Sequence, residues 1–179
     1  LILDGGVKGA RQAINALRSL RDMLSGNSKK SVDITVKWDG APAVFAGEDP
    51  RDGSFFVAKK GIFNANPKIY KSHEDIKADT SGDLTKKLIL AFDELQKLGI
   101  KGVIQGDFMF DNSDLKKETI DGVSYTVFHP NTIAYTVPAD SALAKEIRSA
   151  KIGIVWHTIY TGATFETMQA EFGREIVPK

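Results

Sequence analysis

Hydrophobic residues recur along the chain with two different periods, and each change of period predicts a change of secondary structure. A spacing of three to four residues predicts amphipathic helices over 7–26 and 83–99, each ended by a glycine. Alternating, β-branched or aromatic runs predict strands over 32–38, 43–47, 54–61, 102–110, 119–128, 132–137 and 152–162. Shorter helical patterns cover 140–150 and 164–172, and the polar segment 64–82 predicts a long loop or a weakly structured insert.

Short turn signals separate several of these strands. The pairs Asp52-Gly53 and Asp121-Gly122 are typical of tight connections between neighbouring antiparallel strands. Because strands outnumber helices and follow one another directly, we expect an α+β fold with mainly antiparallel sheets flanked by helices. The pattern shows no internal repeat, so we expect a single domain over 1–179 that opens with a helix within 1–26.

The composition is that of an ordinary globular chain and narrows the possible chemistry. The 179 residues include no cysteine and three histidines, which excludes disulfides, thiolate nucleophiles and cysteine-bound zinc, and disfavours a histidine-rich metal site. The formal net charge of +1 gives no global sign of a polyanionic partner, so any basic surface must be local. Apolar runs fall short of a membrane span, and we expect no membrane partner.

The sequence Lys37-Trp38-Asp39-Gly40 closes the first predicted strand. Strand alternation places Lys37 on one face together with Thr35, and Val36 on the other face. A lysine held in a partly desolvated groove can lose its proton near neutral pH and act as a nucleophile. Gly40 permits a close backbone approach. The alternative is a solvated lysine at a strand end, followed by an Asp-Gly turn.

This tetrapeptide at the end of a strand resembles motif I of the covalent nucleotidyltransferases, the superfamily of DNA ligases, RNA ligases and mRNA capping enzymes. The resemblance implies the ATP-grasp-like core of those enzymes, with Lys37 as the nucleophile that attacks the nucleotide α-phosphate. It also implies nucleotide contacts from the flanking residues, namely Thr35, Val36, Asp39 and Gly40. The chain as a whole resembles uncharacterised proteins of T4-like marine phages.

Two later segments resemble further motifs of that superfamily in the right order. In 55–63, Lys59 and Lys60 precede a glycine, and the resemblance implies contacts to ribose or phosphate; a basic hairpin strand is the alternative. In 102–110, Asp107 follows Gly106 inside an apolar strand, where the family more often has glutamate. The resemblance implies nucleotide and Mg²⁺ binding by Asp107, because phosphoryl transfer needs charge neutralisation. A hydrogen-bonded structural aspartate is the alternative.

The resemblance weakens towards the end of the chain. Segment 152–162 is similar to motif IIIa, and Trp156 is then expected to stack on a nucleobase, although a core position is the alternative. The next residue is His157 where the family has aspartate, and we expect it to be structural. The last two motifs of the family have no match, so we expect them to be absent or to lie beyond the C-terminus.

These observations predict a ligase-like nucleotidyltransferase that forms lysyl-AMP and passes AMP to a nucleic-acid 5′-phosphate. ATP is the expected cofactor together with Mg²⁺, although Thr35 replaces the usual glutamate and leaves GTP open. The expected partner is DNA or RNA, and the expected location is the cytoplasm, that of the host cell if the protein is viral. The alternatives are an inactive nucleotide- or nucleic-acid-binding module and a phage structural or interaction protein. The oligomeric state stays open.

Overall fold

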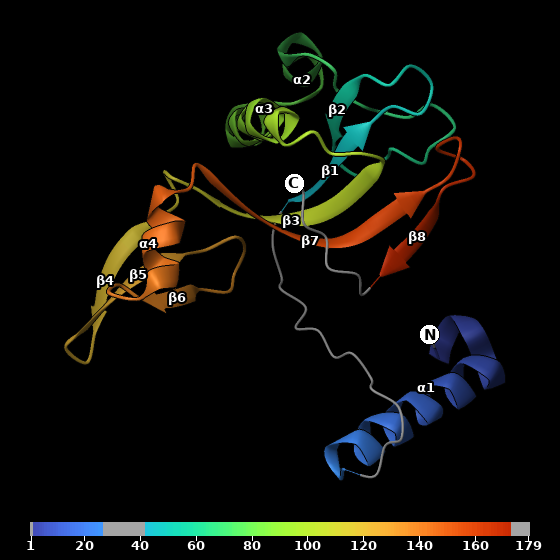
Figure 1. Ribbon diagram of the computed structural model, residues 1–179, viewed down its shortest axis with the longest axis horizontal. Helices are drawn as coiled ribbons and strands as arrows, with labels where there is room; N and C mark the ends of the chain where they lie inside the picture. Colours follow the sequence, from blue (N-terminus) through green and yellow to red (C-terminus); the bar gives the residue numbers. More distant parts are fainter. Residues whose placement is uncertain (1, 27–41, 173–179) are drawn as a thin grey trace. The chain divides into compact units, whose positions relative to one another are not determined.

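The computed structural model describes residues 2–26 and 42–172 of the chain (Figure 1). The chain divides into two compact units, whose described parts are residues 2–26 and 42–172, and each unit is described by itself. In the first unit, α1 spans Ile2–Leu24 and has non-helical backbone angles at Gly6. The expected helix over 7–26 is therefore confirmed almost to its end. The expected strand over 32–38 lies outside the described residues.

The second unit contains a five-stranded sheet in the order β2-β1-β3-β7-β8, in which all neighbouring strands are antiparallel (Figure 1). Its strands are β1 (Ala43–Glu48), β2 (Phe55–Ala58), β3 (Val103–Asp111), β7 (Ile152–Thr161) and β8 (Gln169–Phe172). The central strand β3 pairs with β1 on one side and with β7 on the other. Strands from the two halves of the unit therefore meet at β3.

A smaller antiparallel sheet is inserted between β3 and β7. It consists of β4 (Lys116–Ile120), β5 (Val123–Phe128) and β6 (Tyr135–Pro138), and is followed by α4 (Ala142–Ser149). The turn between β4 and β5 has positive φ at both Asp121 (50°) and Gly122 (80°). Two such residues match the twist of a tight hairpin, which is why the Asp-Gly pair signals this turn correctly.

Two helices cover one face of the five-stranded sheet, which we call the helix face. They are α2 (His73–Asp79) and α3 (Gly82–Leu95), the latter extended by a 3₁₀ turn (Gln96–Leu98) and ended by Gly99 at φ 59°. The buried cluster beneath them is formed by Val44, Ala46, Val57, Tyr70, Ile76, Leu88, Ala91, Phe92, Leu95, Ile100, Ile104 and Phe108. The helical stripe predicted over 83–99 therefore faces the sheet, as amphipathicity requires.

The opposite face of the sheet carries a second buried cluster that contains no helical residue. It consists of Phe45, Phe56, Ala58, Ile62, Val103 and Phe165. Successive strand residues alternate between the two clusters, for example Val103 and Ile104 on β3, as the period of two in a strand requires. The coarse prediction of an α+β fold with antiparallel sheets and helices is confirmed.

Two local predictions were wrong. Segment 64–82 is not a loop throughout, because it contains α2, whose first turn is capped by a hydrogen bond from the Asp75 backbone N–H to the Ser72 hydroxyl (3.1 Å). Segment 164–172 is not helical, because it forms a turn and then β8, which pairs along β7. In both places tertiary contacts override the local pattern, through the fully buried Ile76 in α2 and the open edge of β7 for β8.

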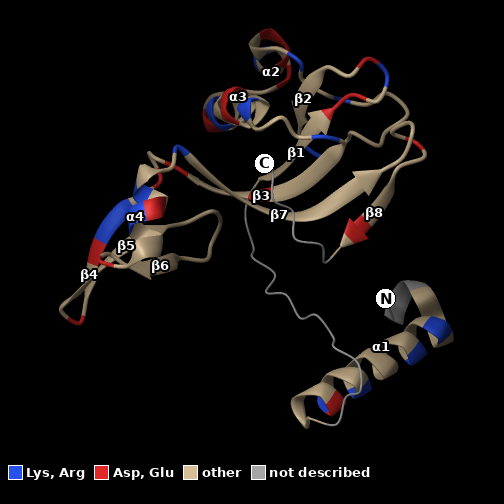
Figure 2. Ribbon diagram, in the orientation of Figure 1, with Lys and Arg blue, Asp and Glu red and all other residues tan. Residues whose placement is uncertain are grey.

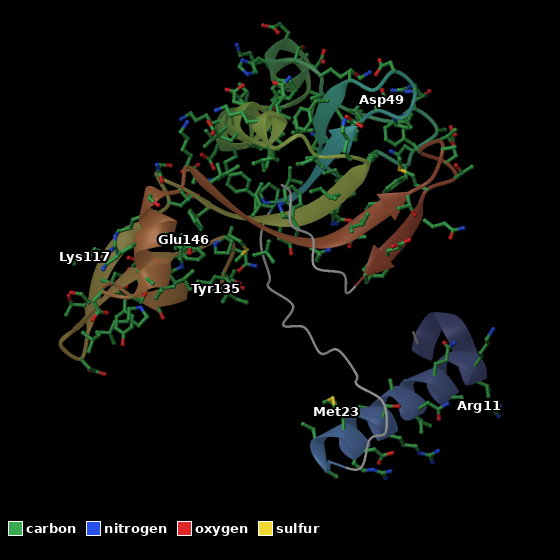
Figure 3. All side chains as sticks on the ribbon, viewed as in Figure 1. Arg11, Met23, Asp49, Lys117, Tyr135 and Glu146 are labelled. Carbon is green, nitrogen blue, oxygen red and sulfur yellow. The ribbon has the colours of Figure 1, made fainter. Side chains whose placement is uncertain are left out.

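The connection between β1 and β2 is organised around a fully buried carboxylate, that of Asp49 (Figure 3). Arg51 donates three side-chain hydrogen bonds to it at 2.8, 2.9 and 3.2 Å, and Lys71 forms an ion pair with it at 2.7 Å. The hydrogen bonds from Arg51 are the largest influence and hold the pKa of the Asp49 carboxyl well below its usual range. The charged carboxylate therefore stabilises the folded state.

We expect Asp49→Asn to lower the free energy of unfolding by about 2 kcal/mol at pH 7, since hydrogen bonds to a charged group are lost. Because the folded pKa is depressed, this contribution is complete above the unfolded value of about 3.9 and disappears as the pH falls further. Urea unfolding at pH 7 and pH 3 tests this, with Asp140→Asn at an exposed position as control. If the difference in free energy of unfolding between the wild type and Asp49→Asn were equally large at pH 7 and pH 3, this prediction would be wrong.

None of the helices in the described ranges 2–26 and 42–172 has the length and apolar character that a bilayer crossing requires.

Candidate functional site

The residues of motif I, from Thr35 to Gly40, lie outside the described residues. The described chain resumes at Pro42, whose carbonyl accepts a hydrogen bond from the backbone N–H of Phe108 (3.0 Å). The next residue, Ala43, begins β1 and lies opposite Asp107 on β3. The segment that follows motif I therefore enters the sheet beside Asp107.

Asp107 lies on the central strand, between Ala43 of β1 and Val155 of β7. Its neighbour Phe108 belongs to the cluster under the helices, so alternation places the Asp107 side chain on the opposite face. That side chain is 15% exposed. A carboxylate in an apolar strand is costly to bury without a polar partner, and the structure supplies one on β7.

The partner is His157, for which the sequence predicts a structural role. The pairing of β3 with β7 passes from Gln105–Thr158 to Gly106–Trp156, so His157 is an extra residue in a β-bulge. Its Nε2 lies 3.8 Å from the Asp107 carboxylate, and its Nδ1 is 2.7 Å from the Thr158 hydroxyl. A bulge redirects a side chain that regular alternation would send elsewhere, and bulges are frequent beside active sites.

These side chains are part of a group of polar residues on the face opposite the helices. Tyr160 donates a hydrogen bond from its hydroxyl to the Gln105 side-chain oxygen (2.7 Å), and burial raises the pKa of Tyr160. We call the group the polar strip; it consists of Gln105, Asp107, His157, Thr158 and Tyr160. The strip offers a carboxylate, an imidazole, an amide and the Tyr160 hydroxyl to a polar ligand, whereas the Thr158 hydroxyl is buried.

Lys59 does not reach the polar strip. Its ammonium lies 3.0 Å from a carboxylate oxygen of Asp79 at the end of α2, on the helix side of the sheet. Asp79 also accepts hydrogen bonds from Lys68 (2.8 Å) and Tyr70 (2.7 Å). These hydrogen bonds, that from Lys68 first, lower the pKa of Asp79, so the carboxylate stays charged and holds Lys59. Lys60 is exposed in the turn after β2.

Trp156 also faces away from the polar strip. It is half-buried and packs against the cluster under the helices together with Ile154. A Cβ added to Gly106 would come within 2.8 Å of both side chains, so the absence of a side chain there makes room for the indole. Asp107 and Trp156 are expected from the resemblance to share one nucleotide site, but they lie on opposite faces of the sheet.

A concavity of about 430 Å³ opens near Pro42 and is lined by Lys87, a lysine that carries no motif signal in the sequence. Lys87 of α3 lies in it with its side chain 12% exposed, within 3.4 Å of three carboxylates, those of Asp83, Asp111 and Asp114. Burial by itself would lower the pKa of Lys87, but hydrogen bonds to Asp114 and Asp111 raise it above its usual value. Lys87 is therefore a charged structural lysine.

Comparison with known proteins yields one match. Over residues 1–178, the chain matches the model of DUF6267, which is described as a family of unknown function. The chain belongs to this family. No curated protein and no solved structure matches it significantly.

The DUF6267 chain contains, within its described residues, no group of three or more His, Cys, Asp or Glu side chains that could hold a metal ion. Asp107 supplies one carboxylate beside an imidazole. Mg²⁺ commonly binds through one or two carboxylates and takes its other ligands from water and substrate phosphates. Asp107 thus fits a Mg²⁺ ion that arrives with a nucleotide, and not one held by protein ligands alone.

Proposed function

We propose that this DUF6267 protein is a nucleotidyltransferase that forms a covalent lysyl-nucleotide on Lys37 and transfers the nucleotide to a nucleic-acid 5′-phosphate. The observation that carries the proposal is the entry of β1 beside Asp107. In the sequence, motif I comes directly before this strand, whose first residue Ala43 pairs with Asp107.

In the proposed reaction, the uncharged Lys37 amine forms a bond to the α-phosphorus of ATP. The bond to the bridging oxygen breaks, its electron pair leaves with pyrophosphate, and the lysine loses a proton. In the second step, an oxygen of the 5′-phosphate attacks the same phosphorus, the phosphorus–nitrogen bond breaks and Lys37 regains a proton. Asp107 would bind Mg²⁺, which neutralises phosphate charge in both steps.

The polar strip supports this chemistry through its arrangement. The imidazole of His157 lies beside Asp107, with its Nε2 3.8 Å from the carboxylate, a distance longer than a hydrogen bond. Gln105 is half-buried on the same face and supplies an amide for a ribose or phosphate, whereas the buried Thr158 hydroxyl pairs with His157. In this scheme Asp107 would hold the metal ion, and Lys37 carries the covalent chemistry.

A second candidate function is reversible binding of a nucleotide or nucleic acid without chemistry. The contacts of Lys59 with Asp79 and of Trp156 with the core favour it, because both residues lie away from Asp107. The two functions make different predictions about covalent labelling, since only the nucleotidyltransferase retains label after denaturation.

The test is incubation of the chain with α-labelled ATP or GTP and Mg²⁺, followed by a denaturing gel. We expect an acid-labile label on the wild type and no label on Lys37→Ala, because the nucleophile has been removed. The control is Lys86→Ala, which removes an exposed lysine of α3 and should label as the wild type does. Equal labelling of both variants would refute the role of Lys37.

An unlabelled wild type would refute nucleotidyl transfer altogether. Reversible binding of ATP by that unlabelled protein, measured by calorimetry, would then support the second candidate. If the wild type showed neither covalent label nor reversible ATP binding, the remaining alternative would be a structural or interaction protein.

A further inference from the structure

The small sheet and α4 enclose a concavity of about 400 Å³ that is separate from the polar strip. Its lining residues come from β4, β5, α4 and the connections beside them, and are Leu115, Lys116, Lys117, Thr126, Ala139 and Arg148. Three of the six carry a positive charge, and none carries a negative charge. We call it the cationic pocket. Figure 2 shows basic residues on both β4 and α4.

The hydrogen bonds of Arg148 fix the shape of the pocket. Its two terminal nitrogens donate to the hydroxyl of Thr126 (2.7 Å) and to the carbonyl of Ala139 (2.9 Å). Thr126 is 3% exposed and lies directly opposite Lys117 in the pairing of β4 with β5. Opposite residues of an antiparallel pair share a face, so Lys117 lies beside the same threonine that Arg148 contacts.

The charges of the pocket are not neutralised by the described protein. Within residues 2–26 and 42–172, no carboxylate forms an ion pair with Lys116, Lys117 or Arg148, whereas Lys87 in the other concavity has three. The acidic residues nearest in sequence, Glu118 and Glu146, do not line the pocket; Figure 3 labels Lys117 and Glu146 on their respective elements. Clustered cations without acidic partners cost electrostatic energy unless an anion binds.

We propose that the cationic pocket is a binding site for a phosphate group. A guanidinium held at a fixed orientation beside lysines is the usual protein arrangement for phosphate, since it offers directed donors together with point charges. The phosphate belongs either to a nucleic-acid backbone or to a small phosphorylated molecule. The site stands on its own geometry and does not depend on nucleotidyl transfer by Lys37.

The test compares two double variants that remove the same number of positive charges. Lys116→Gln/Lys117→Gln changes the pocket, and Lys97→Gln/Lys101→Gln changes two exposed lysines elsewhere (61% and 82% exposed). The first assay is fluorescence anisotropy with a labelled 20-nucleotide single strand of DNA or RNA over a range of salt concentrations. The second is an NMR titration of the same proteins with inorganic phosphate.

If the phosphate belongs to a nucleic acid, we expect the pocket variant to bind the single strand about tenfold more weakly than the control variant near 0.1 M salt. The slope of log affinity against log salt should fall by about 1.4, since each lost phosphate contact on a single strand contributes about 0.7. If the pocket variant shows this smaller slope while its free energy of unfolding equals that of the wild type, the loss of affinity is not caused by unfolding.

If the phosphate belongs to a small molecule, inorganic phosphate should shift the amide signals of Lys117, Thr126 and Arg148 while the strand binds equally to both variants. Arg148→Gln provides a second variant, and its loss of phosphate response should match that of the lysine pair. Wild-type protein that responds to neither ligand, or pocket and control variants that behave alike in both assays, would overturn the proposal. Nucleotide labelling of Lys37 should be the same in the pocket variant and the control variant, so failure of this proposal is distinguishable from failure of nucleotidyl transfer.

Discussion

Phe56→Ala is expected to lower the free energy of unfolding by about 3–5 kcal/mol, the usual cost of truncating a buried phenylalanine. Phe56 is fully buried on the face opposite the helices, and its ring meets that of Phe165 edge to face at 5.7 Å. The substitution removes this contact and leaves a cavity that the rigid strands around it cannot close. A small domain has only about 5–15 kcal/mol of stability, so much of it would be lost.

Phe172→Ala is the matched control, because it deletes the same side chain where it is 73% exposed at the end of β8. We expect its effect to stay within about 0.5 kcal/mol. Urea unfolding followed by circular dichroism gives both values. Similar losses for the two variants would show that the cluster around Phe56 is not packed as described.

Gly47→Ala is expected to cost about 2–5 kcal/mol, the combined effect of backbone strain and overpacking. Gly47 has a φ of 154°, and a Cβ built there would overlap the carbonyl oxygen of Gly102 on the way into β3. That carbonyl accepts a hydrogen bond from the Glu48 backbone N–H (2.9 Å), so it cannot move away without breaking the pairing of β1 with β3. The clash involves backbone and cannot be relieved by a rotamer change.

The control for this prediction is Gly99→Ala. Gly99 has a φ of 59° and nothing within 4 Å of an added Cβ, so only the left-handed conformation is penalised, at about 1–2 kcal/mol. Thermal or urea unfolding of Gly47→Ala and Gly99→Ala separates the cost of backbone strain from the cost of the clash with the Gly102 carbonyl. If Gly99→Ala were as destabilising as Gly47→Ala, the close approach at Gly102 would not be the cause.

The sequence was sufficient to predict the elements whose pattern agrees with their surroundings. The stripe of α3 and the Asp121-Gly122 turn carry strong local signals, and both are found in the structure. Segment 164–172 carries a helical spacing instead, yet Phe165 packs on Phe56 and residues 169–172 pair with β7. The information that decides its conformation lies in distant residues, and periodicity cannot supply it.

The site shows the same limit. Asp107 could be identified as unusual because a carboxylate interrupts an apolar strand, but its proximity to His157 depends on a one-residue bulge in the pairing of β3 with β7. Register is a property of two strands together, so neither strand predicts it. For the same reason the sequence could not show that Trp156 and Asp107 lie on opposite faces, or that Asp79 binds Lys59.

The insertion of the small sheet and α4 between β3 and β7 has a consequence for how the chain reaches its native state. The central strand pairs with residues far away in sequence on both sides, and β3 and β7 are separated by residues 112–151. Such non-local pairing slows folding to the millisecond-to-second range in proteins of high contact order. The inserted segment is built from adjacent hairpins and can form early, bringing its two ends together and reducing the loop that β3 and β7 must close. The rate at which the inserted segment forms would then limit the rate at which the five-stranded sheet folds.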